Sequence, residues 1–178
     1  VGAGNVARSM IAAYAAAFPG AAFTIWNRSP EPARALAAAT GANATEDLEA
    51  ATRNAEIIAT TTMSSVPLIK GEWLAPGTHL DLIGAYRPDM REIDDTALTR
   101  ASLFVDARAT TIHHIGELND PIARGVITEA SIRADYYDLP SGKFARTTPN
   151  EITLCKNGGG AHLDLMTAKY ILAAWRTR

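Results

Sequence analysis

The sequence predicts an α/β protein in which a doubly wound, parallel sheet of the Rossmann type carries helices on both faces. Three observations support this fold class. Short apolar runs typical of buried strands alternate with alanine-rich stretches that have helical spacing. A glycine-rich turn, VGAGNVA at residues 1–7, stands directly before the first of these stretches. The 178 residues suffice for one well-filled domain, and no internal repeat or low-complexity tract interrupts the alternation.

Helices and strands alternate over the first part of the chain. Apolar residues three and four apart predict helices over residues 5–18, 27–40, 45–55 and the later half of 87–101. Short apolar runs bounded by turn residues predict buried strands over residues 21–26, 56–62, 79–85 and 102–107. Strands that alternate with helices in this way favour a parallel sheet.

The second part of the chain has weaker signals. Helical fragments are expected within residues 120–127 and 129–139, before the turn-forming stretch 140–150. Residues 151–157 predict a strand, and residues 161–175 predict an amphipathic helix that we expect to pack back on the sheet. We expect a single domain over residues 1–178, with a core at 1–106, an irregular and helical region at 107–150, and a strand plus helix at 151–178.

Composition narrows the classes of partner. The formal net charge is −2, so neither a basic nucleic-acid surface nor a basic membrane-binding face is predicted. No stretch approaches the roughly 20 apolar residues of a membrane span. The single cysteine, Cys155, has no partner for an internal disulfide, and no Cys/His cluster has the spacing of a zinc site. We expect a protein of the reducing cytoplasm that binds a small neutral or anionic molecule and no metal.

The turn at residues 1–7 has the spacing G-x-G-x-x-A of a dinucleotide-binding motif. Gly2 allows the tight turn, Gly4 lets a pyrophosphate approach the backbone, and Ala7 permits close packing of helix and strand. The start of the following helix favours an anion. Small residues also serve simple strand-to-helix turns, so the motif alone leaves that alternative open.

The end of the predicted strand at residues 21–26 bears on the choice of coenzyme. An NAD-binding unit usually places a carboxylate here, to accept hydrogen bonds from the adenosine ribose. This chain has Asn27, Arg28 and Ser29 instead, and a guanidinium suits a 2′-phosphate. NADP(H) is therefore preferred over NAD(H). The alternative is that Asn27 and Ser29 cap the next helix while Arg28 is solvated.

Hydroxyl-bearing and small residues follow two further predicted strands, at the strand ends where doubly wound sheets bind ligands. Thr62 and Met63 are expected to form walls beside the ribose or the nicotinamide. Gly84 and Ala85 are small enough for a nicotinamide ring to lie against them. A Thr/Ser-rich stretch is also typical of a plain loop, so this interpretation depends on the glycine motif.

The other titratable residues are given structural interpretations, and no catalytic residue is assigned. Each histidine is interpreted as structural or solvated: His79, His113, His114 and His162. Glu92, Asp94 and Asp95 lie where a helix is predicted to begin, and capping and the helix dipole account for them.

Five stretches together resemble the ornithine cyclodeaminase and mu-crystallin family: VGAGNVA, IWNRS, the run from EIIATTT to REIDD, LFVD, and ITLCKNGGGAHLDLMTAKYI. Residues 71–95, GEWLAPGTHLDLIGAYRPDMREIDD, are the most specific part. Their order of Trp, Pro-Gly, strand, Gly and Pro-Asp-x-x-Glu-x-Asp is hard to obtain from a generic Rossmann unit.

The resemblance implies a Rossmann domain and a second domain, built largely from the N-terminal part, that carries substrate contacts and the dimer interface. On this basis the chain is expected to be a truncated, C-terminal portion that begins inside the first Rossmann strand and lacks the N-terminal domain. The Arg and Lys residues that bind the substrate carboxylate in relatives are then expected upstream. A homodimer is expected for the full-length protein.

The family includes ornithine cyclodeaminases, alanine dehydrogenases and NAD(P)H-dependent reductases of cyclic imino acids. IWNRS is similar to the NADPH-using ketimine reductase branch, and Tyr86 stands where cyclodeaminases place a catalytic Asp. The leading hypothesis is therefore reduction of Δ1-pyrroline-2-carboxylate or Δ1-piperideine-2-carboxylate to proline or pipecolate. An NAD-dependent ornithine cyclodeaminase and a non-catalytic NADPH-binding protein remain as alternatives.

The resemblance also assigns residues to parts of the coenzyme. It places Gly4, Asn5 and Val6 at the pyrophosphate, together with Gly2 in the turn, and Asn27, Arg28 and Ser29 at the adenosine phosphate. It places Thr62, Met63, Ile83, Gly84 and Ala85 on the nicotinamide side. Asn157 matches a family Ser that approaches the coenzyme before the last helix, and an Asn also forms hydrogen bonds there.

Overall fold

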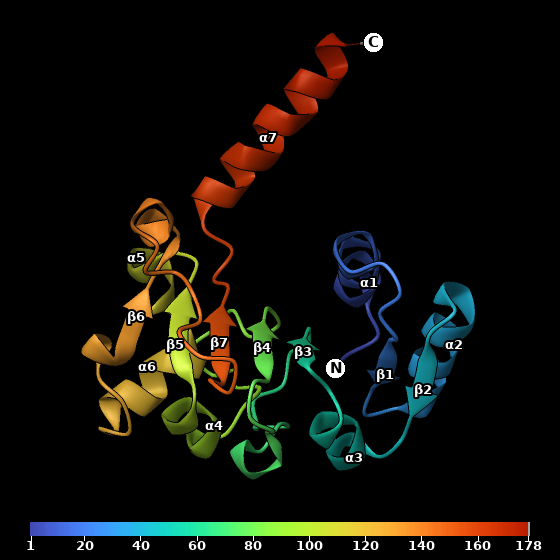
Figure 1. The fold of residues 1–178 in the computed structure, drawn as a ribbon, viewed down its shortest axis with the longest axis horizontal. Helices are drawn as coiled ribbons and strands as arrows, with labels where there is room; N and C mark the ends of the chain where they lie inside the picture. Colours follow the sequence, from blue (N-terminus) through green and yellow to red (C-terminus); the bar gives the residue numbers. More distant parts are fainter. Residues whose placement is uncertain (178) are drawn as a thin grey trace.

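The main sheet consists of five parallel strands (Figure 1). The structure is a computed structural model that describes residues 1–177. From one edge to the other, the strands are β3 (Ile57–Thr60), β4 (His79–Leu82), β7 (Thr153–Lys156), β5 (Ser102–Val105) and β6 (Ile132–Ala134). The last strand in the chain, β7, thus lies at the centre, where Lys156 is in register with both Leu82 and Val105. The α/β fold class is confirmed.

A second, two-stranded parallel sheet pairs β1 (Thr24–Trp26) with β2 (Asn43–Thr45). The helices α1 (Asn5–Ala17) and α2 (Pro30–Thr40) belong to this part, and α2 ends at Gly41 in the left-handed conformation. Its small core consists of the buried residues Ala7, Ile25, Ala33, Leu36 and Ala37. Strand β2 was not predicted, because Asn43 and Ala44 are exposed and give no apolar pattern.

Residues at the start of the chain join the two sheets. The Val1 carbonyl accepts from the Thr61 amide (2.9 Å), and the Gly2 amide donates to the Trp26 carbonyl (2.8 Å). The N-terminus accordingly lies between β1 and β3 in Figure 1. A cavity of about 810 Å³ opens between the two sheets, and Ile11, Ile25 and Ile58 are among its lining residues.

The main core packs helices against the five-stranded sheet. The helices α4 (Asp95–Arg100), α5 (Arg108–Thr111) and α6 (Gly116–Ala123) follow β4 and β5 in the chain, and Leu98 and Leu118 join the central cluster. Leu80 and Leu154, on the inner strands, are fully buried. The apolar runs that predicted buried strands are explained by this placement, since a parallel sheet is covered on both faces.

Short elements complete the fold: α3 (Leu48–Arg53), and the 3-10 turns η1 (Gly71–Trp73), η2 (Glu129–Ser131) and η3 (Tyr136–Ser141). The helical fragments expected within residues 129–139 are present as η2 and η3, but the prediction missed the strand β6 between them. Ile132 and Ala134 alternate with the exposed Arg133 there, which is a strand pattern of only three residues. The short run explains why the signal was missed.

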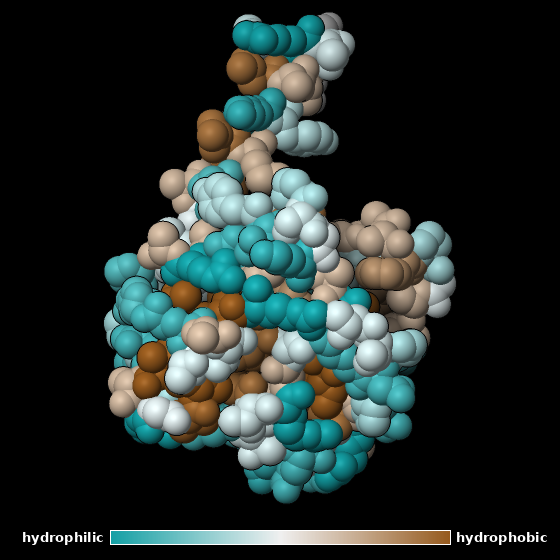
Figure 2. All heavy atoms as spheres, turned by 60° about the vertical axis from the view of Figure 1, so that its left-hand side comes forward, coloured by the Kyte–Doolittle hydropathy of each residue, from teal (hydrophilic) through white to brown (hydrophobic). Residues whose placement is uncertain are grey.

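The last helix, α7 (Ala161–Arg176), extends away from the sheet (Figure 1), so the prediction that it packs back was wrong. None of residues 161–176 is buried. Figure 2 shows apolar side chains along this projecting helix, and Met166, Ile171 and Trp175 are each more than 60% exposed. In the described part of the chain, no helix combines the length and apolar character needed to cross a membrane.

Candidate functional site

The carboxyl ends of the strands bring together loops that are distant in the sequence. Thr62 follows β3, Gly84 and Ala85 follow β4, and Asn157 follows β7. The Gly84 amide donates to the Thr60 carbonyl (3.1 Å), and the Asn157 amide donates to the Leu82 carbonyl (3.0 Å). This edge is where parallel sheets of this kind bind ligands, and the residues predicted on the nicotinamide side lie along it.

The glycine turn has the geometry that its sequence predicts. Gly2 adopts a φ of +101°, and a Cβ there would lie 2.5 Å from Thr61 Oγ1. A Cβ on Gly4 would meet no heavy atom of residues 1–177 within 4 Å. The backbone at Gly4 is therefore open, and Ala7 is buried against the small core.

The start of α1 is arranged to receive an anion. Gly4 occupies the N-cap position and supplies no side chain, and the first turn carries no acidic residue. Asn5 and Val6 are exposed. Free backbone N–H groups at a helix start carry partial positive charge, and here no carboxylate neutralises them. A phosphate fits this position.

Residues 27–29, which follow β1, include the exposed cation Arg28. Asn27 Nδ2 donates to the Ser29 carbonyl (2.9 Å), and the Ser29 side chain makes no capping bond with α2. Arg28 is exposed, and within residues 1–177 its guanidinium has no hydrogen-bond or ion-pair partner. Ser29 thus occupies the N-cap position of α2, as the alternative has it, but its side chain makes no capping bond, and a solvated Arg28 also matches the structure.

Glu92 was expected near a helix start as a capping residue, but it lies in the interior. It is fully buried, and its carboxylate accepts hydrogen bonds from the Thr60 hydroxyl (2.7 Å), the Thr62 amide and hydroxyl (2.7 Å each) and the Ala85 amide (3.1 Å). The helix-capping interpretation of Glu92 was wrong. Capping is confirmed for Asp94, which accepts from the Ala97 amide (2.8 Å).

Asp95 lies in the first turn of α4 and pairs with two arginines, Arg91 at 2.9 Å and Arg124 at 2.8 Å. Hydrogen bonds from Arg124 lower the pKa of Asp95 to about 2. Asp95 is therefore ionised near neutral pH. Its place at the helix start and these pairs give it a structural role, as predicted.

Two more ionisable residues, Glu117 and Lys156, are buried in the interior near Glu92. Glu117 accepts from the amides of Glu92 (2.8 Å) and Ile93 (3.1 Å), and Lys156 Nζ donates to the Leu82 carbonyl (3.0 Å). Burial raises the pKa of Glu117 to about 7 and lowers the pKa of Lys156. Sequence reasoning missed both residues. Lys156 was read only as part of an apolar strand, and Glu117 lies in a region with weak signals.

The remaining predicted residues differ in exposure. Met63 is 73% exposed and Tyr86 is 55% exposed, so both face the open side of the edge. Ile83 and Asn157 are half-buried, and Ala85 is fully buried. Met63 and Tyr86 are therefore open to a ligand that lies along this edge, whereas the Ala85 side chain lies below the surface.

The histidines do not gather at this edge as a group. His79 Nδ1 lies 2.8 Å from Thr153 Oγ1 at the amino ends of β4 and β7, and His113 lies 3.5 Å from Glu129. His162 Nε2 lies 3.8 Å from Asp106 Oδ2. Among the described residues, no three His, Cys, Asp or Glu side chains are grouped to hold a metal ion.

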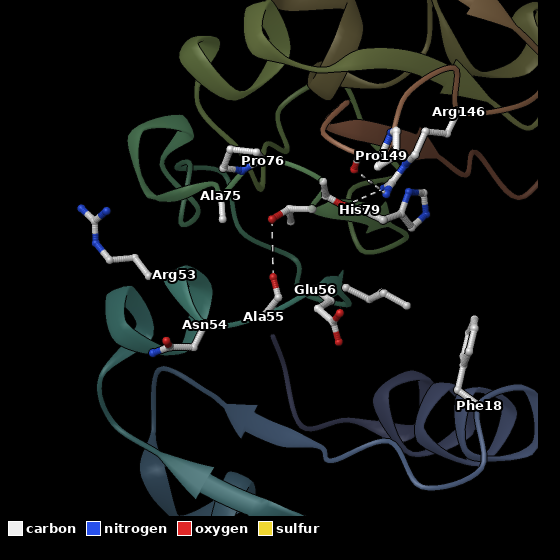
Figure 3. Close-up of a pocket in the computed structure, with 13 residues that line it drawn as sticks. Phe18, Arg53, Asn54, Ala55, Glu56, Ala75, Pro76, His79, Arg146 and Pro149 are labelled. Carbon is white, nitrogen blue, oxygen red and sulfur yellow. Dashed lines mark hydrogen bonds between the residues drawn. The ribbon is translucent and has the colours of Figure 1, made fainter.

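Another cavity, of about 560 Å³, lies at the opposite end of the strands (Figure 3). Phe18, Glu56, His79 and Arg146 are among its lining residues, and Arg146 donates to the Gly77 carbonyl (2.7 Å). None of the predicted site residues lines it. This cavity faces the amino ends of β3 and β4, so it is separate from the candidate site.

Comparison with known proteins shows the family of this chain. Residues 1–178 match the ornithine cyclodeaminase/mu-crystallin family over their whole length. The chain belongs to this family. A Δ1-pyrroline-2-carboxylate reductase of Paracoccus denitrificans (strain Pd 1222) is 50% identical over 178 residues, which are 96% of this chain and 56% of that protein.

Two solved structures of the same fold are similar to this chain. The Thermococcus litoralis Δ1-pyrroline-2-carboxylate reductase, in complex with NADH and L-proline, matches with a TM-score of 0.83 and 30% identity, over 94% of this chain and 54% of that one. An archaeal alanine dehydrogenase dimer with bound NAD matches with a TM-score of 0.88 and 29% identity, over 99% and 57%. The chain thus spans little more than half the length of each relative.

Proposed function

We propose that this chain is the coenzyme-binding part of a reductase that uses NADPH to reduce a cyclic imino acid. The substrate is Δ1-pyrroline-2-carboxylate or Δ1-piperideine-2-carboxylate, and the product is proline or pipecolate. The observation that carries the proposal is the 50% identity with a Δ1-pyrroline-2-carboxylate reductase, across nearly the whole chain. The solved relative that binds NADH and L-proline adds support.

The site residues fit a nicotinamide dinucleotide. Gly2 forms the tight turn, and the open backbone at Gly4, Asn5 and Val6 accepts the pyrophosphate. Thr62, Gly84 and Ala85 then border the nicotinamide, with Ile83, Met63 and Asn157 beside them. When bound, the reduced coenzyme supplies a hydride to the carbon of the C=N bond. The chain itself contributes orientation and electrostatic stabilisation.

The choice of NADPH over NADH rests on Arg28, with Asn27 and Ser29 beside it. The Arg28 guanidinium is exposed and unpaired within residues 1–177, so it is free to pair with a 2′-phosphate. Residues 27–29, directly after β1, include no carboxylate that would repel that phosphate. NAD(H) remains the alternative, since the two solved relatives contain NADH or NAD.

We further propose that the protein is a cytoplasmic homodimer that binds a small imino or amino acid as substrate. The solved alanine dehydrogenase relative is a dimer, which supports that assembly. Cys155 is a free, buried thiol, in keeping with a reducing compartment. Burial raises the pKa of Cys155 to about 12, so the thiol is an inert part of the interior.

Steady-state kinetics of the full-length protein test the proposal. We expect NADPH oxidation with Δ1-pyrroline-2-carboxylate or Δ1-piperideine-2-carboxylate, and no ammonia release from ornithine. Conversion of ornithine to proline and ammonia, without turnover of either imino acid, would instead identify a cyclodeaminase. NADPH binding without turnover of any of these compounds would identify a non-catalytic binding protein.

A further inference from the structure

A buried carboxylate links the two loops that border the proposed nicotinamide position. Glu92 has no exposed surface, and its two oxygens accept four hydrogen bonds. Three of the donors belong to the end of β3, namely the Thr60 hydroxyl and the amide and hydroxyl of Thr62. The fourth donor is the amide of Ala85, after β4.

The same carboxylate limits how close the two loops come. A Cβ added to Gly84 would collide with the Thr62 backbone and with Glu92 Oε1. Gly84 therefore lies directly between the two loops, against the Glu92 carboxylate. The separation of Thr62 from Ala85 is set by this contact and by the hydrogen bonds to both residues.

Glu92 is itself held from a second direction. The Glu117 carboxylate accepts from the amides of Glu92 and Ile93, which fixes the backbone that carries Glu92. Lys156, on the central strand β7, donates to the Leu82 carbonyl just before the loop that contains Gly84. These three ionisable side chains are buried, and they attach the loops to the sheet.

We propose that Glu92 is a positioning residue, which holds Thr62 and Ala85 at the spacing that the nicotinamide half of the coenzyme requires. This inference rests on the proposed function. Hydride transfer depends on holding the reacting atoms within a fraction of an ångström of the productive geometry, and such walls need support from behind. Glu92 supplies that support through the backbone of Thr62 and Ala85, without touching the coenzyme.

Glu92→Gln tests the proposal in the full-length protein. A carboxamide has one acceptor oxygen, and its NH2 group faces donors, so the bonds to Thr62 and Ala85 are not all kept. We expect NADPH to bind about tenfold or more weakly to E92Q, the range for loss of charged hydrogen bonds. The affinity for 2′-phospho-ADP-ribose should change less than about twofold, because this compound lacks the nicotinamide and does not reach the loops that Glu92 holds.

A matched control separates positioning from general loss of structure. Asp135 is another buried carboxylate that accepts backbone amides, from Tyr137 at 3.0 Å, but it lies beside β6. Asp135→Asn should lower thermal stability and leave the ratio of the two affinities unchanged. Should E92Q fail to fold, Thr60→Val removes a single hydroxyl donor and is expected to shift the same ratio in the same direction.

The outcomes distinguish this inference from the proposed function. If the wild-type protein binds neither NADPH nor 2′-phospho-ADP-ribose, the proposed function fails. If the wild-type protein binds both, but the Glu92 or Thr60 variant weakens both equally or neither, the positioning role of Glu92 is overturned and the proposed function stands.

Discussion

Single residues at the turn and at the end of β1 carry the coenzyme assignment. Gly2 needs a conformation that other residues rarely adopt, and Arg28 is a cation with no partner among residues 1–177. In the proposed function, each feature suits one part of a dinucleotide: the turn at Gly2 suits the diphosphate, and Arg28 suits a 2′-phosphate. Substitutions of these single residues therefore provide the most specific tests.

Arg28→Ala tests the choice of coenzyme. Loss of a charge-assisted contact to the 2′-phosphate should weaken NADPH binding by about 1–3 kcal/mol, while NADH binding changes little. Titration calorimetry with both coenzymes measures the difference. Arg133→Ala, on the edge strand β6, is the matched control and should alter neither affinity. Equal weakening of NADPH and NADH by R28A would contradict the role of Arg28.

Gly2→Ala tests the close approach of the turn to Thr61. The positive φ alone costs about 1–2 kcal/mol, and the short contact of a Cβ with Thr61 Oγ1 adds to it. Gly20→Ala is a matched control, because Gly20 has a φ of +91° and open space around it. Chemical denaturation should show a larger loss of stability for G2A than for G20A. Equal losses would mean that contact with Thr61 is unimportant.

The raised pKa of Glu117 makes the stability of the protein depend on pH. Its folded pKa of about 7 lies above the ordinary value of 4.5, so the folded state holds a proton that the unfolded state has lost. The free energy of unfolding should therefore fall between about pH 4.5 and 7, by up to about 1.4 kcal/mol per pH unit, and level off above.

Denaturation curves of wild type and Glu117→Gln across that range measure this effect. The difference between the two proteins cancels the titration of other groups, including His79, whose pKa burial lowers. A wild-type minus variant difference that is constant with pH would show that Glu117 titrates normally. Activity is a separate readout, since Glu117 supports the backbone of Glu92.

At the scale of elements, the position of β7 dominates the fold. This strand comes last in the chain, yet it pairs with both β4 and β5 and carries Lys156 and Asn157 to the site. A central strand in a parallel sheet is buried on both faces, and Leu154 has no exposed surface. The sheet therefore depends on residues 151–157.

Leu154→Ala tests that dependence. Truncating a fully buried leucine should lower the free energy of unfolding by about 2–5 kcal/mol. Leu139→Ala, in η3, is the matched control because Leu139 is 55% exposed, and it should cost far less. Urea denaturation of both variants gives the comparison. Similar losses for the two leucines would contradict the central place of β7.

For the whole molecule, periodicity predicted the fold class and most elements, and it failed where a signal was short or long-range. Strands β2 and β6 have three residues each, too few to show alternation. The insertion of β7 between β4 and β5 depends on contacts across more than 45 residues, which local patterns do not contain. The amphipathic pattern of α7 predicted a helix but not where it packs.

Part of the candidate site could likewise be predicted from local sequence, and part could not. The candidate residues Gly2 and Gly4 could be proposed from the sequence because their motif lies in one short stretch. Glu92, Glu117 and Lys156 come from three separate segments, and only the folded chain brings them together. The acidic character of Glu92 also misled the interpretation, because an acidic residue near a helix start usually serves as a cap.

A crystal structure of the full-length protein with NADPH tests the central claim most directly. We predict density for the diphosphate against the backbone of Gly4, Asn5 and Val6, with the 2′-phosphate within hydrogen-bond distance of Arg28. A coenzyme bound in the cavity beside His79 and Arg146, with nothing at the start of α1, would contradict the account.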